Sequence, residues 1–129
     1  MKGCIIATAV VLAGCGATGP TADGIVAKTE QSAYARPATV SAVITNTSTE
    51  TLFTSPCLRF QRRMGSGWVE ASAQQICPAV LAQLPAGQSS SASGFLGAEA
   101  APGEYRGVAV VERQAGDLPA VVTNTFMVQ

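Results

Sequence analysis

The segment that decides the fold class is ATVSAVIT, residues 38–45. Apolar residues stand at every second position, with mostly hydroxyl-bearing residues between them: Val40, Ala42 and Ile44 form one set, and Thr39, Ser41, Val43 and Thr45 form the other. A period of two residues is typical of a β-strand that buries one face. The polar stretch at residues 46–49 follows and predicts a turn.

The rest of the chain repeats this succession of short strand and turn. Glycine, proline, asparagine and serine separate the apolar segments, and further strands are expected at residues 25–32, 52–54, 57–64, 68–70, 88–96, 105–112 and 121–128. Gly65-Ser66-Gly67 indicates a hairpin between two of them. Residues 72–84 have apolar side chains at helical spacing, but Pro78 interrupts them, so we expect a loop with at most one helical turn. About seven short strands without a sustained helix predict an all-β, antiparallel β-sandwich.

One face of these strands should form the core. Its expected members are Val40, Ala42, Ile44, Leu58, Phe60, Trp68, Tyr105, Ala109, Val111, Phe126 and Val128. Aromatic residues make up only 5% of the whole chain. A small domain of this kind would benefit from a covalent crosslink.

The first residues have the layout of a secretory signal. A single lysine, Lys2, precedes a short apolar run from Cys4 to Leu12, and small residues follow the run. The run is far shorter than the roughly 20 apolar residues that a membrane-spanning helix needs. Leu12-Ala13-Gly14-Cys15 resembles, residue for residue, the lipobox of bacterial lipoproteins.

This resemblance implies that Cys15 carries a lipid. A dedicated peptidase would cut between Gly14 and Cys15, and a diacylglycerol on Cys15 Sγ would hold the protein to a membrane. Gly16 favours the outer membrane of a two-membrane cell, where the protein would face the periplasm. The chain then divides into a signal peptide at 1–14, the lipidated cysteine and a flexible tether at 15–24, and one folded domain at 25–129.

Processing separates the four cysteines into distinct roles. Cys4 leaves with the signal peptide and Cys15 carries the lipid, which leaves Cys57 and Cys77 in an oxidising compartment. A metal site would need two further ligands at suitable spacing, and a redox pair would need a Cys-x-x-Cys motif; the sequence has neither. We therefore expect a disulfide between Cys57 and Cys77. By analogy with sandwiches that pack a tryptophan on a disulfide, Trp68 should lie in the core beside it, and the alternative is an exposed binding role.

Composition argues against several classes of function. The chain has no histidine, which is the commonest general acid or base and the commonest metal ligand. Eight basic and eight acidic residues cancel, so nothing indicates a nucleic acid as partner. The serines at 89–91 lack both the closing glycine of a Gly-x-Ser-x-Gly motif and a base. We expect no catalytic residue, no metal ligand, no cofactor and no small-molecule substrate.

Arg59, Arg62 and Arg63 form the one charge cluster of the sequence. Arg59 and Arg63 should share one face of a strand, because side chains alternate along it. Such charges commonly protect a solvent-facing strand from edge-to-edge pairing. The alternative is contact with anionic lipid headgroups or with a partner protein, so Arg59 and Arg63 are the possible binding surface.

An ordered series of short motifs resembles a known family. The series is Ile44-Thr45-Asn46-Thr47-Ser48, Leu52-Phe53, a strand through Phe60 and Arg62, Gly67-Trp68, Leu84-Pro85-Ala86-Gly87-Gln88-Ser89, Pro102-Gly103-Glu104-Tyr105-Arg106 and Phe126-Met127-Val128. Its order and spacing resemble the immunoglobulin-like domains of exported bacterial lipoproteins and, more distantly, bacterial intracellular proteinase inhibitors. The segment from Cys77 to Leu84 is an insertion relative to that pattern.

The resemblance implies a binding or scaffolding module without an active site. Our first hypothesis is a membrane-tethered module, attached through the lipid on Cys15, that binds an unidentified protein of the cell envelope. The second is an inhibitor of an envelope protease or another hydrolase, which would insert residues 72–84 into its target.

Replacing Cys15 tests the lipid anchor. A serine hydroxyl does not supply the thiol that receives the lipid, so the Cys15→Ser variant should stay uncleaved and unlipidated. Mass spectrometry of the variant isolated from cells measures both modifications. Normal maturation of the variant would show that the lipobox prediction is wrong.

Overall fold

The computed structural model describes residues 21–22, 24–72, 77–78, 80–114, 116–117 and 121–129. Cys15 and the rest of the lipobox lie outside these ranges, so the signal peptide and the anchor stay predictions. Every regular element in the described ranges is a strand, which confirms the all-β prediction. No helix there is long and apolar enough to cross a membrane.

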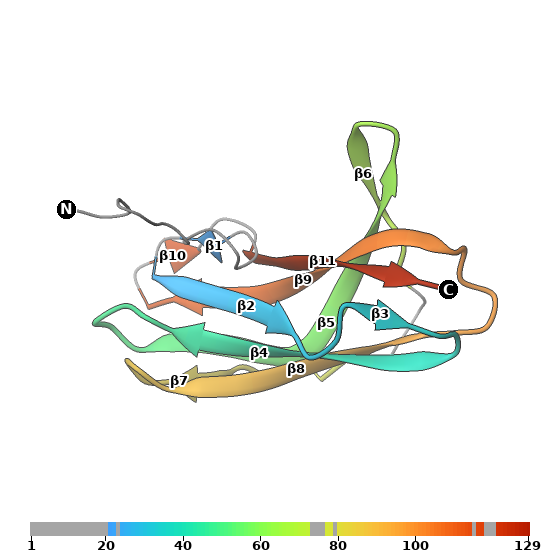
Figure 1. The fold of residues 1–129 in the computed structure, drawn as a ribbon. Coiled ribbons are helices and arrows are strands. Elements are labelled where there is room, and N and C mark those ends of the chain that lie inside the picture. Colours follow the sequence, from blue (N-terminus) through green and yellow to red (C-terminus); the bar gives the residue numbers. More distant parts are fainter. Residues whose placement is uncertain (1–20, 23, 73–76, 79, 115, 118–120) are drawn as a thin grey trace, which may run out of the picture.

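The strands form one curled sheet. They are β1 (Thr21–Ala22), β2 (Ile25–Thr29), β3 (Ala33–Tyr34), β4 (Ala38–Asn46), β5 (Leu52–Met64), β6 (Gly67–Glu70), β7 (Ala82–Leu84), β8 (Ser89–Leu96), β9 (Gly103–Arg113), β10 (Gly116–Asp117) and β11 (Val121–Val128). Their order is β1-β2-β4-β8-β5-β9-β11-β3, with β10 on β9 and both β6 and β7 on β5. Figure 1 shows this sheet curling into a half-barrel around the core.

The sheet is mixed, so the prediction of an antiparallel sheet is wrong. β11 runs parallel to β3, and β5 meets β8 in a single parallel bridge between Cys57 and Ser93. The remaining pairs in the described ranges are antiparallel. Alternation in the sequence could not reveal this, because side chains alternate with the same period in parallel and antiparallel strands.

β5 is one long strand where the sequence predicted two. Ser55-Pro56 was expected to end the first of them, but the chain continues through a register shift against β9 between Thr54 and Leu58. A bulge of this kind accommodates a proline, which cannot donate a ladder hydrogen bond. Before the bulge β5 pairs with β7, and after it β5 pairs with β6.

Short strands also form where the sequence predicted none. Thr21 and Ala22, the end of the expected tether, pair as β1 with the start of β2. Ala82–Leu84, at the end of the expected loop, forms β7 against β5. Two-residue strands carry too little alternation to be read from a sequence.

The core matches the predicted face with one exception. Its buried members are Ile25, Ala27, Tyr34, Val40, Ala42, Ile44, Leu52, Leu58, Phe60, Leu84, Ala92, Leu96, Tyr105, Ala109, Val111, Val121, Phe126 and Val128. Phe126 lies among three aromatic rings, with centroid distances of 5.4 Å to Tyr34 and 6.2 Å to both Phe60 and Tyr105. Trp68 is the exception, because it is half-buried and lies outside the core cluster.

Two asparagines hold the ends of strands together. Asn124 lies at a register shift in β11 and joins β2: its Oδ1 accepts from Thr29 N at 2.9 Å, and its Nδ2 donates to Thr29 Oγ1 at 2.9 Å. Asn46 is fully buried at the end of β4 and donates to the carbonyl oxygens of Glu50 and Leu84. Its Oδ1 accepts from Ser48 N at 2.9 Å, which makes the predicted turn an Asx-turn.

Gly94 permits the close approach of β8 to β5. A Cβ atom there would overlap the carbonyl oxygen of Leu58 and would lie 2.7 Å from Phe60 Cε2. Gly94 follows Ser93, the β8 partner of Cys57 in the bridge that joins the two halves of the sheet. No side chain larger than hydrogen fits at this crossing without displacing backbone.

Replacing Gly94 tests this crossing. The Gly94→Ala variant should lower the free energy of unfolding by about 3 kcal/mol or more, because the added methyl group meets backbone and a ring packed in the core. Gly67→Ala is the matched control, since its nearest contact would lie at 4.0 Å. Urea unfolding of both variants with the disulfide intact gives the two values. Equal stability of the two variants would contradict this account.

Candidate functional site

The β5–β6 hairpin is the most prominent surface feature of the described chain. Its turn is Gly65-Ser66, and Gly65 has a φ of +63°, which suits glycine at the first position of a tight hairpin turn. Nothing lies within 4 Å of a Cβ built on Gly65, so the tip is surrounded by solvent. Figure 1 shows the hairpin projecting from the body of the sheet, which confirms the predicted hairpin.

Arg59 and Arg63 both lie on the face of β5 that points away from the core. They alternate with buried Leu58 and Phe60 along the strand. Arg59 Nη1 is 3.6 Å from Glu70 Oε1, and Arg63 Nη1 is 3.9 Å from Glu104 Oε1. All four side chains are between 37% and 51% exposed. Ion pairs of this length in solvent contribute little to stability. The two arginines therefore leave much of their charge available.

Arg62, the third arginine of the cluster, points to the opposite face of the hairpin. Its Nε and Nη2 donate to the carbonyl oxygen of Pro102 at 3.3 Å and 3.2 Å. Arg62 thus ties the base of the hairpin to the loop before β9. Its role in the described structure is to position the hairpin.

Trp68 stacks against two guanidinium groups instead of entering the core. Arg106 Cζ lies 4.4 Å from the ring centroid, and Arg63 Cζ lies 5.4 Å from it. A guanidinium over an indole face is a favourable cation–π contact. The prediction that Trp68 anchors the core is therefore wrong: Trp68 is half-buried among charged side chains on the outer face of the sheet.

Arg106 is the candidate site residue that sequence reasoning missed. It comes from β9, where it faces Gln61 of β5, and its Nε donates to Gln61 Oε1 at 2.8 Å. Burial lowers the pKa of Arg106, and the charge of nearby Arg63 lowers this pKa further. No local signal in the sequence could have joined Arg106 to Trp68, because their proximity depends on how β9 pairs with β5.

The hairpin has the composition of a contact surface. Met64 is 50% exposed and Val69 is 47% exposed on the face of the hairpin that carries Arg62, opposite to Trp68 and Arg63. Tryptophan, methionine and arginine are enriched at protein–protein interfaces. No group of three cysteine or acidic side chains among the described residues could hold a metal ion.

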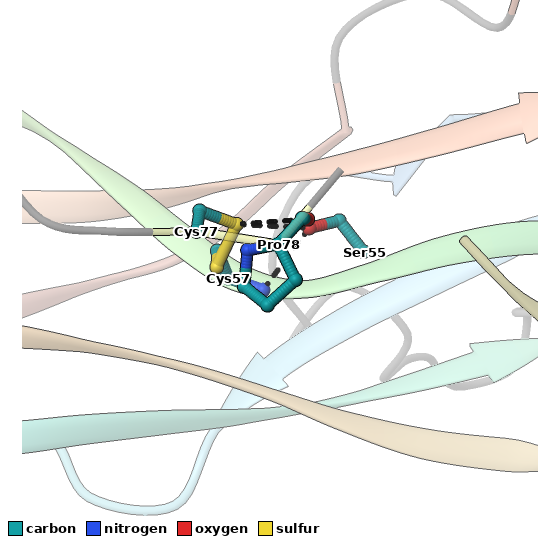
Figure 2. Close-up of a disulfide and its surroundings, with 4 residues drawn as sticks. All are labelled: Ser55, Cys57, Cys77 and Pro78. Atoms are coloured by element: carbon teal, nitrogen blue, oxygen red, sulfur yellow. Dashed lines mark hydrogen bonds between the residues drawn. A yellow bond between two sulfur atoms is a disulfide. The ribbon is translucent and has the colours of Figure 1, made fainter. Parts of the chain in front are cut away.

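The disulfide joins Cys57 to Cys77 with a Cα–Cα distance of 6.0 Å, in agreement with the predicted pairing. Figure 2 shows it beside Ser55, whose Oγ lies 3.5 Å from Cys77 Sγ and accepts a hydrogen bond from Cys57 N at 3.2 Å. Cys57 lies in the β5 bulge and forms the bridge to Ser93 of β8. The crosslink therefore fastens the exposed segment at Cys77 and Pro78 to the centre of the sheet.

Comparison with known proteins yields only distant likenesses. No protein-family model matches the chain, and no curated protein matches it. Similar solved structures include a β-glucosidase from Erythrobacter marinus (TM-score 0.45, 14% identity), the PmoD soluble domain from Methylocystis sp. (0.40, 15%) and a β-glucosidase from Listeria innocua with glucose (0.37, 17%). They match 82%, 81% and 81% of this chain, and 15%, 90% and 16% of their own chains. The chain thus spans about a sixth of the length of either glucosidase, and likenesses this low assign no activity.

Removing the disulfide tests its contribution to stability. The Cys57→Ser/Cys77→Ser double variant should lose about 3 kcal/mol in free energy of unfolding, because a loop spanning 20 residues is no longer closed in the unfolded chain. Urea unfolding measures the change. Wild-type protein in excess reductant should match the double variant, and an unchanged midpoint in both would contradict the prediction.

Proposed function

We propose that this chain is an exported lipoprotein, held to the cell envelope by lipid on Cys15, whose folded domain binds another envelope protein and carries no active site. We take the curled sheet as an immunoglobulin-like β-sandwich. The lipobox supports the anchor, and the all-β core supports the domain assignment. The observation that carries the binding function is the exposed, aromatic and arginine-rich β5–β6 hairpin.

The binding surface is the projecting β5–β6 hairpin with its base. Arg59, Arg63, Trp68 and Arg106 lie on its outer face, and Met64 and Val69 are exposed on the opposite face, beside Arg62. Tryptophan and arginine dominate the binding energy of many interfaces, because each offers a large contact area together with a polar group. Here these residues are held in place before binding, since the two guanidinium groups stack on Trp68 and Arg106 is fixed by Gln61. A surface ordered in advance loses little conformational entropy on binding.

The exposed segment after the disulfide favours a second function, inhibition of an envelope hydrolase. Cys77 is tied to β5, and Val80, three residues further on, is 67% exposed. Residues 73–76 and 79 of the predicted inhibitory loop lie outside the described residues. An apolar side chain on a loop that is held at both ends, by the disulfide at Cys77 and by β7 on β5, is a feature that a hydrolase cleft could receive.

Site-specific photocrosslinking in living cells separates the two functions. A photoreactive amino acid at Val69 should capture one discrete envelope protein, because Val69 lies 47% exposed on the hairpin. The matched control is Phe95, which is 51% exposed on β8. A discrete adduct with a protease or other hydrolase at Val80, with none at Val69, would instead favour the inhibitor. Identical adducts at Val69 and Phe95 would contradict the hairpin as binding surface.

A further inference from the structure

The guanidinium groups of Arg63 and Arg106 have donors without acceptors. Arg106 uses Nε for Gln61 and has no ion pair with a described residue. Arg63 makes no hydrogen bond to a described residue, and its Nη1 is 3.9 Å from Glu104 Oε1, beyond hydrogen-bond range. Each guanidinium carries five N–H donors. Two converging cations therefore present several donors around the Trp68 ring.

The local charge is positive. The hairpin and its base contain four arginines, Arg59, Arg62, Arg63 and Arg106, and two carboxylates, Glu70 and Glu104. Two positive charges are therefore not balanced there. Burial lowers the pKa of Arg106, and the charge of Arg63 lowers it further, so the two cations repel each other. An additional anion would relieve this repulsion.

Among the described residues, only β5 pairs with β6, which leaves the outer edge of β6 open to them. Ala71 N donates to Phe60 O, and hydrogen-bonded pairs alternate along an antiparallel ladder, so the backbone groups of Trp68 and Glu70 point toward the open edge. An extended segment can pair with such an edge and add a strand.

A strand added there would carry its side chains to the two arginines. Adjacent strands lie about 4.8 Å apart, and every second side chain of the added strand would share the face that carries Trp68. Arg63 and Arg106 stack on that indole, so a long acidic side chain next to Trp68 on the added strand would extend along the ring toward their guanidinium groups. A carboxylate accepts two parallel hydrogen bonds from a guanidinium, which makes it a suitable acceptor.

A protein segment suits this site better than a lipid surface. Glu70 and Glu104 flank the two arginines, so a flat layer of headgroup phosphates would press against both carboxylates. A single acidic side chain on a strand avoids that repulsion. The open edge also offers backbone hydrogen bonds, which a lipid headgroup cannot match in register.

We propose that β6 pairs with an extended acidic segment of the partner protein, and that Arg63 and Arg106 receive one of its carboxylates beside Trp68. This inference rests on the proposed function, since it names the chemistry of the partner at the same hairpin. It commits to a glutamate- or aspartate-bearing strand as the occupant.

Fluorescence of Trp68, the single tryptophan of the chain, reports occupancy of the site. The probe is a synthetic peptide of alternating glutamate and threonine, compared with the same peptide carrying glutamine for glutamate, both titrated against the full chain. The glutamate peptide should bind at least about tenfold more tightly, because hydrogen bonds between charged groups are stronger than those between neutral ones.

Four variants test the residues. Arg63→Gln and Arg106→Gln should each weaken binding of the glutamate peptide about tenfold and leave the glutamine peptide unaffected. Lys28→Gln, which removes an exposed cation from β2, should change neither affinity. Glu104→Gln should strengthen glutamate-peptide binding, because it removes a competing carboxylate. Thermal unfolding midpoints verify that each variant is folded.

Three results would overturn the inference: no binding of the glutamate peptide, equal binding of both peptides, or binding that the arginine variants do not change. Arginine-dependent binding to phosphatidylglycerol vesicles without peptide binding would assign the site to lipid instead. A partner crosslinked at Val69 together with arginine-independent peptide binding would leave the proposed function standing and remove this inference. Arginine-dependent peptide binding without any crosslinked partner would support this inference and contradict the proposed function.

Discussion

The close approach of β8 to β5 at Gly94 is the constraint on which the rest of the structure depends. It brings the β2–β4–β8 half of the sheet against the half formed by β5, β9 and β11, and the core fills the space between them. The crosslink through Cys57 lies at the same place, and the projecting hairpin is the far end of the same strand. β5 therefore carries the curl, the disulfide and the contact surface.

Features that depend on local alternation could be predicted from the sequence. Residues 38–45 and 121–128 are strands because their apolar side chains repeat every second residue, and the same repeat identifies most of the core. Features that depend on pairing between distant strands could not. The parallel contacts of β5 and β11, and the meeting of Trp68 with Arg106, follow from register, which alternation within one strand does not encode. Trp68 was placed in the core by analogy, yet two cations cover its ring.

Charge is distributed unevenly over the molecule. Charged residues make up 12% of the chain, and four of its eight basic residues lie on or beside the β5–β6 hairpin. By contrast, the outer face of β8 exposes Ser89, Ser91 and Ser93, whose hydroxyl groups make it polar without adding charge. Charges on an interface set the choice of partner and the rate of encounter more than they set affinity. Under the proposed function, partner specificity is thus concentrated at one end of β5.

The pairing of β1 with β2 sets how far the domain can stand from its anchor. Thr21 is six residues beyond Cys15, and an extended chain spans at most about 3.4 Å per residue, so about 20 Å separates the lipid from the first ordered strand at full stretch. With the proposed lipid on Cys15, this length keeps the start of β1 within about 20 Å of the bilayer surface. Any protein that it binds would then be selected for position as well as for chemistry, from those that present an acidic strand close to the membrane.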